Sequence, residues 1–280
     1  MAFSFGDLAG SGSIAVMGII NLSPDSFYSR SSLSSTSEVF RTAEKMIHEG
    51  AHILDVGAES TRPGSRGISV KLELERLLPV ITKLTKEFNV PISVDTYKPD
   101  VALVALQEGA TVINDISALG AGDKMANVVS QHKAGIVLMH MQGTPETMQN
   151  NPYYKDVCME VLDFLSQRIT LAEKAGIKSE SIAIDPGIGF GKTLTHNIDL
   201  IAKLDQLKIL DKQILLGVSR KSFTGDILNL EPADRLEGSI AAGIVGIING
   251  ANILRVHDVG PTMRAVLVAQ ALMKASQKND

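Results

Sequence analysis

The chain has 280 residues, contains no tryptophan and has a single cysteine, Cys158. One cysteine excludes a disulfide within the chain and favours a reducing compartment, so we expect a cytoplasmic location. No apolar run approaches the roughly 18 residues that a membrane-spanning helix needs, so we expect no membrane partner. The formal net charge of −4 argues against a nucleic-acid partner, although it leaves room for a locally basic pocket that binds an anionic small molecule.

Two common kinds of site are also missing. The loop DPGIGFGKT has too few residues between its first glycine and GKT for a nucleotide-binding P-loop. The first apolar run does not end in His-x-His, which a metal-dependent amidohydrolase on a barrel would need. The scattered positions of His140, His196 and His257 indicate no transition-metal site.

What the chain does have is a regular series of short apolar runs. Eight runs, each followed by a polar or ionisable residue, alternate with helix-like sequence or glycine-rich loops. The runs are AVMGII, HILDVG, PISV, TVI, GIVLM, SIAI, QILLGV and NILRV, and the residues after them are Asn21, Glu59 and Arg62, Asp95, Asn114, His140, Asp185, Ser219 to Lys221, and His257. This series predicts an α/β fold, a single-domain (β/α)8 TIM barrel over residues 1–280, with its site at the carboxyl ends of the strands.

The segments between the runs have the period and the end signals of helices. A helix after Ser37 should end at Gly50, and Pro99 should begin another helix. A helix over about residues 70–88 contains Pro79; a proline there costs about 3 kcal/mol, so we expect a kink or a break. Three loops that follow strands are the ones expected to move: residues 23–35, 62–69 and 141–154.

Asp95, Asn114 and Asp185 end three separate predicted strands, so they should converge towards the barrel axis. Together they offer acceptors and one amide to a flat heterocycle that is rich in hydrogen-bond donors. Each of them could instead cap the following helix, and for Asp95 this alternative is a serious one. For the three together, ligand recognition is favoured, and Lys221 is expected to add a cation to the same opening.

A second group of side chains suits an anion. Arg255 lies within the last predicted strand and His257 at its end, while Arg62, Asn21 and the start of the helix after SRKSF supply further donors. Barrels of this kind commonly bind phosphate around their last two loops. A lone histidine or arginine is usually a structural group, but two basic residues at one strand end favour an anion site.

Seven segments resemble the dihydropteroate synthase family over essentially the whole chain: MGIINLSPDSF, DVGAESTRPGS, SVDT, VINDIS, DPGIGFGKTLTHN, GVSRKSF and ILRVHDV. The resemblance implies a transferase of folate biosynthesis on a (β/α)8 barrel. Such an enzyme joins 6-hydroxymethyl-7,8-dihydropterin pyrophosphate to p-aminobenzoate with Mg²⁺, giving 7,8-dihydropteroate and pyrophosphate. Sulfonamides, which mimic p-aminobenzoate, are then expected to compete with it.

The resemblance also implies a role for individual residues. The positions that match the family's pterin contacts are Asp95, Asn114, Asp185, Lys221 and Arg255. Those that match its pyrophosphate contacts are Asn21, Arg62, Arg255 and His257, with Asn21 also the expected contact to Mg²⁺. Those that match its p-aminobenzoate contacts are Thr61, Pro63, Phe190, Lys221 and Ser222. The residues expected to be catalytic are Asp95, Lys221 and Arg62, and the loops with Asp25 and Arg62 are expected to close over bound pterin.

The chain departs from the family pattern in its first loop, which reads YSRSS after the phenylalanine, and at Ile188, where phenylalanine is frequent. Two alternatives stay open. One is a corrinoid-dependent methyltransferase of the same superfamily, which would have no p-aminobenzoate to bind and therefore no need of STRPGS and SRKSF. The other is a catalytically silent pterin-binding protein, which would be expected to lose Asn21, Arg62 or His257.

The stretch LEGSIAAGIVGIINGA before the last strand lacks a polar face, because every residue from Ile240 to Ile248 is apolar or glycine. The following helix, from about residue 261 to 275, is similarly apolar. A helix on the outside of a barrel normally has one polar face. We therefore expect a homodimer that covers these two helices, and the family resemblance implies the same assembly.

Overall fold

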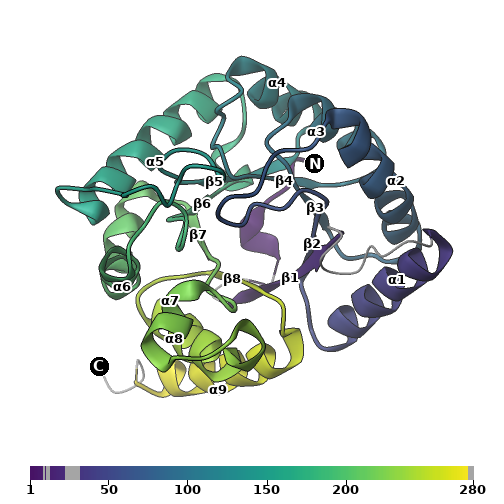
Figure 1. Cartoon of the computed structure of the whole chain (residues 1–280). Coiled ribbons are helices and arrows are strands. Elements are labelled where there is room, and N and C mark those ends of the chain that lie inside the picture. Colours follow the sequence, from purple (N-terminus) through teal and green to yellow (C-terminus); the bar gives the residue numbers. More distant parts are fainter. Residues whose placement is uncertain (9, 11–12, 23–31, 277–280) are drawn as a thin grey trace.

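The structure is a computed structural model that describes residues 1–8, 10, 13–22 and 32–276. Eight parallel strands close into a barrel in sequence order, with β8 paired to β1, and helices surround it (Figure 1). The strands are β1 (Ala15–Asn21), β2 (Ile53–Gly57), β3 (Ile92–Asp95), β4 (Val112–Asp115), β5 (Gly135–Met139), β6 (Ile182–Asp185), β7 (Gln213–Leu216) and β8 (Ile253–Val256). The prediction of a single-domain (β/α)8 barrel is therefore confirmed.

A helix follows each strand, and two helices lie between β7 and β8. The α-helices are α1 (Ser32–His48), α2 (Val70–Glu87), α3 (Pro99–Gln107), α4 (Asp123–His132), α5 (Val157–Lys174), α6 (Leu194–Ala202), α7 (Ser222–Leu228), α8 (Leu236–Ile248) and α9 (Val259–Ser276). The short 3₁₀ helices are η1 (Phe5–Asp7), η2 (Ser179–Ser181), η3 (Leu204–Leu210) and η4 (Pro232–Asp234). Within the described residues, no helix combines the length and the apolar character needed to cross a membrane.

The alternation of side chains along each strand separates the barrel interior from the helix layer. Phe5 of η1 packs with an apolar cluster inside the barrel, on the amino-terminal side of the polar strand-end residues. The cluster consists of Phe5, Ala15, Met17, Ile53, Val112, Val137, Ala183, Leu215 and Ile253. Two residues further along four of these strands, a polar or charged side chain takes the equivalent position: Asp55, Asn114, Asp185 and Arg255. The interior thus changes from apolar to polar towards the carboxyl ends of the strands.

The intervening residues of the strands face the helices and form the main core with them. Among the buried strand residues of this core are Val16, Leu54, Val94, Ile113, Ile136, Ile184, Leu216 and Leu254. Cys158, in α5, is buried in the same core, and its thiol is free.

Helix ends follow the sequence signals at several places. Pro99 is the first residue of α3, and Gly50 and Gly109 have φ values of +99° and +100° after the ends of α1 and α3. These left-handed conformations favour glycine over any residue with a Cβ atom. The structure differs at the start of α1, which begins at Ser32 rather than after Ser37. A serine favours a helix start but does not prevent the helix from extending before it.

The helix α2 runs from Val70 to Glu87 with Pro79 inside it. Of the two expectations, the break at Pro79 was therefore wrong, and the kink stays a prediction. Pro79 is exposed, whereas its neighbours Val80 and Ile81 are buried against the barrel. Because packing of an apolar face supplies most of the stability of a helix in a protein, it outweighs the local cost of the proline.

Replacing Pro79 by alanine should stabilise the protein by about 1–2 kcal/mol. The new N–H can donate to the carbonyl of Glu75, one turn earlier, and the gain is reduced because alanine leaves the unfolded chain more flexible. Chemical denaturation of wild type and Pro79→Ala measures the difference. Pro99→Ala is the matched control: at a first-turn position no hydrogen bond is recovered, so no gain is expected. Equal stability changes in the two variants would contradict this account.

Candidate active site

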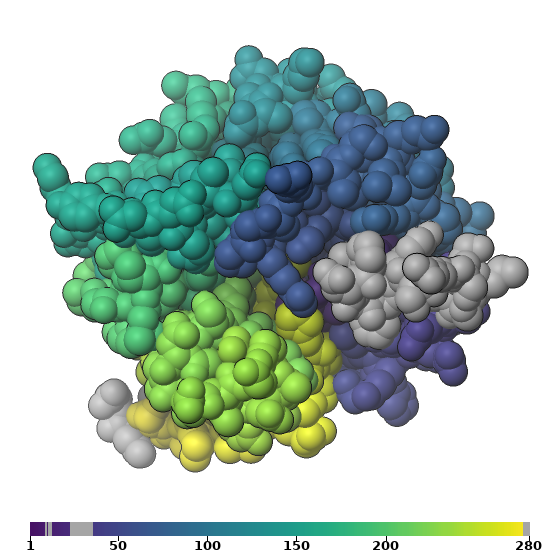
Figure 2. All heavy atoms as spheres, in the orientation of Figure 1, coloured from purple at the N-terminus to yellow at the C-terminus, as the bar shows by residue number. Residues whose placement is uncertain are grey.

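The carboxyl ends of the strands form the mouth of the barrel, and the loop after β2 extends over it (Figure 1). Gly64 N of this loop donates to Pro145 O of the loop after β5, at 2.9 Å. In the space-filling view, this dark blue loop lies beside the centre of the face, where yellow atoms from the end of the chain are visible (Figure 2). Segments far apart in sequence therefore meet at the mouth.

An arginine between two carboxylates forms the base of the mouth. Arg255 Nε donates to Asp55 Oδ2 at 2.6 Å, and its Nη2 donates to Asp95 Oδ2 at 2.8 Å. Asn114 Nδ2 also donates to Asp55 Oδ2, at 3.1 Å. Burial alone would lower the pKa of Arg255, but the charges of Asp55 and Asp95 outweigh burial and raise it. Burial raises the pKa of Asp95 to about 7, against the opposing effect of Arg255.

Asp55 was not predicted from the sequence as a site residue, although it is the most enclosed member of this cluster. Its side chain is fully buried, and its Oδ1 accepts no hydrogen bond from any described residue. The signal was present, because a carboxylate inside the apolar run HILDVG needs a buried partner. Arg255, inside the run NILRV, is that partner. It forms ion pairs with both Asp55 and Asp95.

A second pair of charges comes from Asp185, the last residue of β6, and from Lys221, which lies after β7 and immediately before α7. A Cβ atom added at Gly217 would stand 3.8 Å from Lys221 Nζ and 3.9 Å from Asp185 Oδ2, so both groups converge on this glycine. Burial raises the pKa of Asp185. Burial also lowers the pKa of Lys221 to about 8, with Asp185 acting in the opposite direction. Lys221 Nζ lies 4.6 Å from the centre of the Phe190 ring and donates to Ile188 O.

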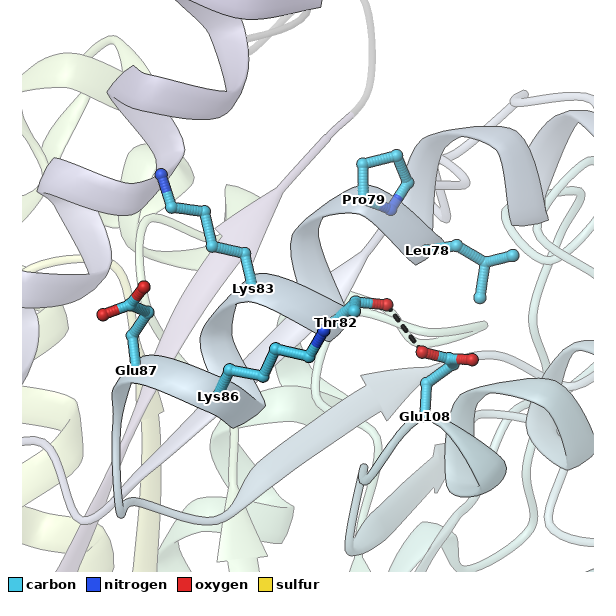
Figure 3. A pocket seen from close by; sticks show the side chains of 7 residues that line it. All are labelled: Leu78, Pro79, Thr82, Lys83, Lys86, Glu87 and Glu108. Carbon is cyan, nitrogen blue, oxygen red and sulfur yellow. Dashed lines mark hydrogen bonds between the residues drawn. The ribbon is translucent and has the colours of Figure 1, made fainter.

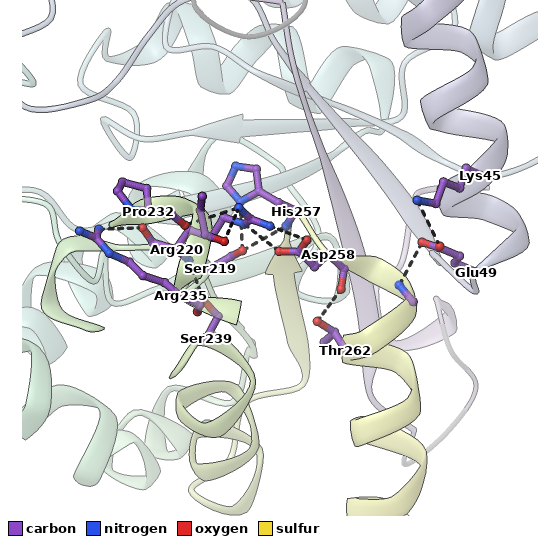
Figure 4. A network of polar contacts seen from close by, with 12 residues as sticks. Lys45, Glu49, Ser219, Arg220, Pro232, Arg235, Ser239, His257, Asp258 and Thr262 are labelled. Carbon is purple, nitrogen blue, oxygen red and sulfur yellow. Dashed lines mark hydrogen bonds and ion pairs between the residues drawn. The ribbon is translucent and has the colours of Figure 1, made fainter. Parts of the chain in front are cut away.

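The residues after β7 and β8 are joined by a polar network (Figure 4). Arg220 pairs with Asp258 through two hydrogen bonds, from Nε at 2.9 Å and from Nη2 at 2.8 Å. Ser219 Oγ lies 3.0 Å from His257 Nδ1 and accepts from His257 N at 3.2 Å. Burial lowers the pKa of His257 to about 4, with Arg255 the next largest cause. This neutral imidazole can therefore offer one N–H to an anion near neutral pH.

The remaining predicted residues lie on the rim. Asn21 ends β1, and a Cβ atom at Gly57 would stand 3.8 Å from Asn21 Oδ1 and 3.7 Å from Asp95 Oδ2. Asn21 thus borders the charged cluster. Thr61, Arg62 and Pro63 lie on the loop after β2, where Arg62 and Pro63 are exposed, and the charge of Arg62 acts on His257. Ser222 is exposed at the first position of α7. The first loop, with Asp25, lies outside the described residues.

A buried ionic cluster beneath the loop after β2 was also missed in the sequence. Glu59 accepts from Tyr97 Oη at 2.6 Å, from Ile68 N at 3.0 Å and from Lys98 Nζ. Lys98 also pairs with Glu73, whose side chain is 1% exposed. Because Glu59 precedes the loop and Ile68 ends it, this cluster fixes both ends of the segment that carries Thr61, Arg62 and Pro63. Glutamate on a helix usually faces solvent, so no local pattern indicates that Glu73 is buried.

Two surface hollows of the described residues lie away from the mouth. The first, about 510 Å³ in volume, lies outside the barrel on α2 and is lined by Leu78, Pro79, Thr82, Lys83, Lys86, Glu87 and Glu108 (Figure 3). Its only drawn hydrogen bond joins Thr82 to Glu108 at 2.7 Å. The second, about 330 Å³, lies at the amino-terminal end of the barrel beside Met1, Lys133 and Lys178. Neither includes a strand-end residue, so the candidate site is the mouth.

Comparison with known proteins gives the class of this barrel. A family model described as pterin binding enzyme matches residues 17–257. The chain is thus a pterin-binding (β/α)8-barrel enzyme. A dihydropteroate synthase of Escherichia coli is 43% identical over 262 residues, which cover 94% of this chain and 93% of that protein. The chain belongs to the dihydropteroate synthase family and is a transferase.

Solved structures agree with this assignment. A Yersinia pestis dihydropteroate synthase in complex with a sulfonamide drug has a TM-score of 0.90 and 37% identity, covering 98% of this chain and 100% of that one. A Xanthomonas albilineans dihydropteroate synthase with 4-aminobenzoic acid has a TM-score of 0.87 and 41% identity, covering 94% of each chain. The resemblance found in the sequence is confirmed.

Removing Asp55 should destabilise the protein by about 2–4 kcal/mol, because it leaves the largely buried Arg255 with one carboxylate and Asn114 without its acceptor. The comparison is chemical denaturation of wild type and Asp55→Ala. Asp226→Ala, which removes an exposed carboxylate of α7, is the matched control and should change stability by less than about 0.5 kcal/mol. If Asp55→Ala were as stable as its control, Arg255 would not depend on this carboxylate.

Proposed function

We propose that the protein condenses 6-hydroxymethyl-7,8-dihydropterin pyrophosphate with p-aminobenzoate to give 7,8-dihydropteroate and pyrophosphate, with the mouth of the barrel as the active site. The observation that carries the proposal is the cluster of Asp55, Asp95 and Asn114 around Arg255. Asp55 Oδ1 in this cluster is a buried acceptor without a hydrogen-bond partner among the described residues. A buried acceptor without a donor is costly, and a pterin ring supplies N–H donors.

The pterin pocket is assigned to residues of several strand ends. Asp95, Asn114 and Asp185 supply acceptors and an amide, and Arg255 and Lys221 supply cations beside them. Arg255 is fixed by two carboxylates, so its planar guanidinium is held in one orientation against which a flat ring can stack. These groups come from β3, β4, β6 and β8 or directly follow β7, which favours a preformed pocket.

The pyrophosphate pocket is assigned to the rim beside β1 and β8. Arg62, Arg255 and His257 supply donors and positive charge, and Asn21 supplies an amide. The described residues contain no group of three His, Cys, Asp or Glu side chains that could hold a metal ion alone. The amide oxygen of Asn21 fits Mg²⁺ only as a shared ligand with substrate phosphates, which is a usual mode for this ion. Mg²⁺ held there would neutralise charge on the leaving pyrophosphate.

The reaction follows from these charges. Arg62, Arg255 and His257 stabilise pyrophosphate as its bond to the pterin methylene breaks. The carboxylate of Asp95, held 2.8 Å from Arg255 Nη2, stabilises the positive charge that develops on the pterin methylene carbon. The amine of p-aminobenzoate then attacks that carbon. The chain supplies positioning and electrostatics, and no side chain forms a covalent intermediate.

The p-aminobenzoate pocket is assigned to loops rather than strands. Thr61 and Pro63 are on the loop after β2, and Phe190 is on the loop after β6. Lys221 immediately precedes α7, and Ser222 is the first residue of that helix. Lys221 near the Phe190 ring offers an aromatic face and a cation to a benzoate. A corrinoid-dependent methyltransferase would need no such pocket, and a silent pterin-binding protein would not need Asn21, Arg62 and His257 together.

The test uses purified protein with dihydropterin pyrophosphate, Mg²⁺ and labelled p-aminobenzoate. Labelled dihydropteroate above a no-enzyme control is the expected result, and a sulfonamide should compete with p-aminobenzoate. If no product forms while the folded protein still binds a pterin, the silent alternative holds. Transfer of a methyl group from methyltetrahydrofolate to a corrinoid would support the methyltransferase instead.

Activity should fall as the pH rises above about 8. Because the pKa of Lys221 is lowered to about 8, the side chain is protonated below that pH and loses its charge above it, together with its attraction for the benzoate carboxylate. A pH profile of kcat/KM for p-aminobenzoate measures this loss. Lys221→Met should have much lower activity at every pH and no fall with a midpoint near 8. The same alkaline fall in Lys221→Met would assign it to another group.

The finer expectations on location and assembly belong to the same proposal. A cytoplasmic location is supported by the lone, buried Cys158.

A homodimer is supported by exposed apolar side chains on α8 and α9, two helices that pack together: Val245, Ile248, Leu267, Val268 and Leu272. All five are at least 46% exposed, and an apolar patch of this kind on a globular protein usually marks a partner surface. A second copy of the chain is the commonest partner.

Val245→Arg and Leu267→Glu should each shift the protein from dimer towards monomer or aggregate, because each places a charge in the apolar contact. Light scattering at micromolar concentration measures the mass. Leu171→Glu, on α5 at 46% exposure, is the matched control and should leave the dimer intact. A monomer mass for the unmodified protein would refute the proposed dimer.

A further inference from the structure

Side-chain hydrogen bonds hold much of the loop after β6, residues 186–193, in place. Four consecutive carbonyl groups of this loop each accept a hydrogen bond from a different side chain. Ile188 O accepts from Lys221, Gly189 O from Gln149 at 3.0 Å, Phe190 O from Lys192 at 3.0 Å, and Gly191 O from Tyr154 at 2.8 Å. Gly187, Gly189 and Gly191 have positive φ values, so the backbone here has no regular structure to fix it.

Lys192 is the most buried side chain of this set, with 3% of its surface exposed. Besides Phe190 O, its Nζ lies 2.9 Å from His140 Nδ1 and 3.4 Å from His140 O, at the end of β5. Lys192 therefore joins the loop to the barrel at one nitrogen. An amine has two N–H groups and an ammonium has three, so both carbonyl oxygens receive a donor in either protonation state.

The contact with β5 is close as well as polar. A Cβ atom at Gly187 would stand 1.8 Å from His140 O, so the backbone of the loop lies directly against the end of β5. Burial lowers the pKa of His140 to about 3, with Lys192 the next cause. The imidazole is therefore neutral, and its ring packs edge-on against Phe164 with 4.9 Å between ring centres. The hydrogen-bond partner of Lys192 is thus a neutral imidazole that is packed against Phe164.

The two lysines fix the two ends of one short segment. Lys221 holds the carbonyl of Ile188, and Lys192 holds the carbonyl of Phe190. Between them the Phe190 ring lies 4.6 Å from Lys221 Nζ. The cluster of Asp55, Asp95, Asn114 and Arg255 belongs to β2, β3, β4 and β8 and has no hydrogen bond to this segment among the described residues.

From this geometry we propose that Lys192 is a positioning residue for the p-aminobenzoate half of the site. It acts through the backbone of Phe190 and sets the distance between the Phe190 ring and Lys221. The inference rests on the proposed function, because it takes Phe190 and Lys221 as the contacts of p-aminobenzoate. The pterin contacts Asp95, Asn114 and Arg255 form their side-chain hydrogen bonds with other strands. Asp185 accepts from Gly187 N, outside the segment from Ile188 to Phe190, so pterin binding should depend on Lys192 far less than p-aminobenzoate binding.

The experiment is steady-state kinetics of Lys192→Met with each substrate varied in turn. The KM for p-aminobenzoate should rise by about tenfold or more, since a small displacement of positioning groups is costly, while the KM for dihydropterin pyrophosphate should change by less than about threefold. Calorimetric titration of dihydropterin pyrophosphate into the free variant should give the wild-type affinity. A purely structural lysine would lower the melting temperature and leave both KM values unchanged.

The chain offers a matched control in Lys212→Met. Lys212 is a second enclosed lysine, with a side chain that is 6% exposed, paired to Glu173 at 3.1 Å. It precedes β7 at the opposite end of the barrel. This variant should lose stability without a change in either KM. If Lys192→Met does not fold, Lys192→Gln replaces it, because its amide is polar but one bond too short to place a donor at the same point.

The outcomes separate the two proposals. If the wild-type protein makes no dihydropteroate, the proposed function fails. If the wild type is active and Lys192→Met changes both KM values equally or changes neither, the positioning role of Lys192 is overturned. A selective rise in the KM for p-aminobenzoate that is absent in Lys212→Met supports it.

Discussion

The site depends on one interaction, the pairing of Arg255, whose side chain is 19% exposed, with Asp55 and Asp95. A guanidinium inside a barrel is tolerated only with carboxylates around it, and each carboxylate in turn needs the arginine. These three residues come from β8, β2 and β3, so the ion pairs also join strands that are far apart in sequence. Because the carboxylates are already held by Arg255, they meet a substrate in fixed positions. The same burial raises the pKa of Asp95 and lowers that of Lys221.

The two halves of the mouth are built in different ways. In the pterin half, the two-residue period of the strands places a polar side chain directly above an apolar one, as in Ile53 and Asp55 or Ala183 and Asp185. Rigidity there comes from the sheet. In the p-aminobenzoate half, loops carry the groups, and buried side chains outside the mouth hold those loops. Glu59 and Lys98 hold the loop after β2, and Lys192 holds the loop after β6. A pocket built on strand ends and a pocket built on loops therefore share Lys221.

Most of the fold was predictable because barrel strands repeat a simple local pattern. Apolar runs with a polar last residue marked all eight strands, and Pro99 and Gly109 marked the ends of α3. The predicted break at Pro79 was wrong, since only the packing of α2 on the barrel decides whether the helix tolerates a proline there. Asp55 was missed because its charge lies inside an apolar run, and its need for Arg255 spans 200 positions of the chain. Lys192 lies in the loop DPGIGFGKT, whose spacing does not match a P-loop, so the sequence pattern assigns this lysine no role of its own.

The sequence by itself determined the barrel, the direction of its strands and the set of polar residues at their carboxyl ends. These follow from periods of two and of about 3.6 residues, which are local properties. The seven segments that resemble the family also lie in the sequence alone. Only the tertiary structure decided which charges meet: that Arg255 lies between Asp55 and Asp95, that Glu73 is buried against Lys98, and that Lys192 contacts His140. Such pairings depend on closure of the barrel, which brings together residues that no local pattern connects.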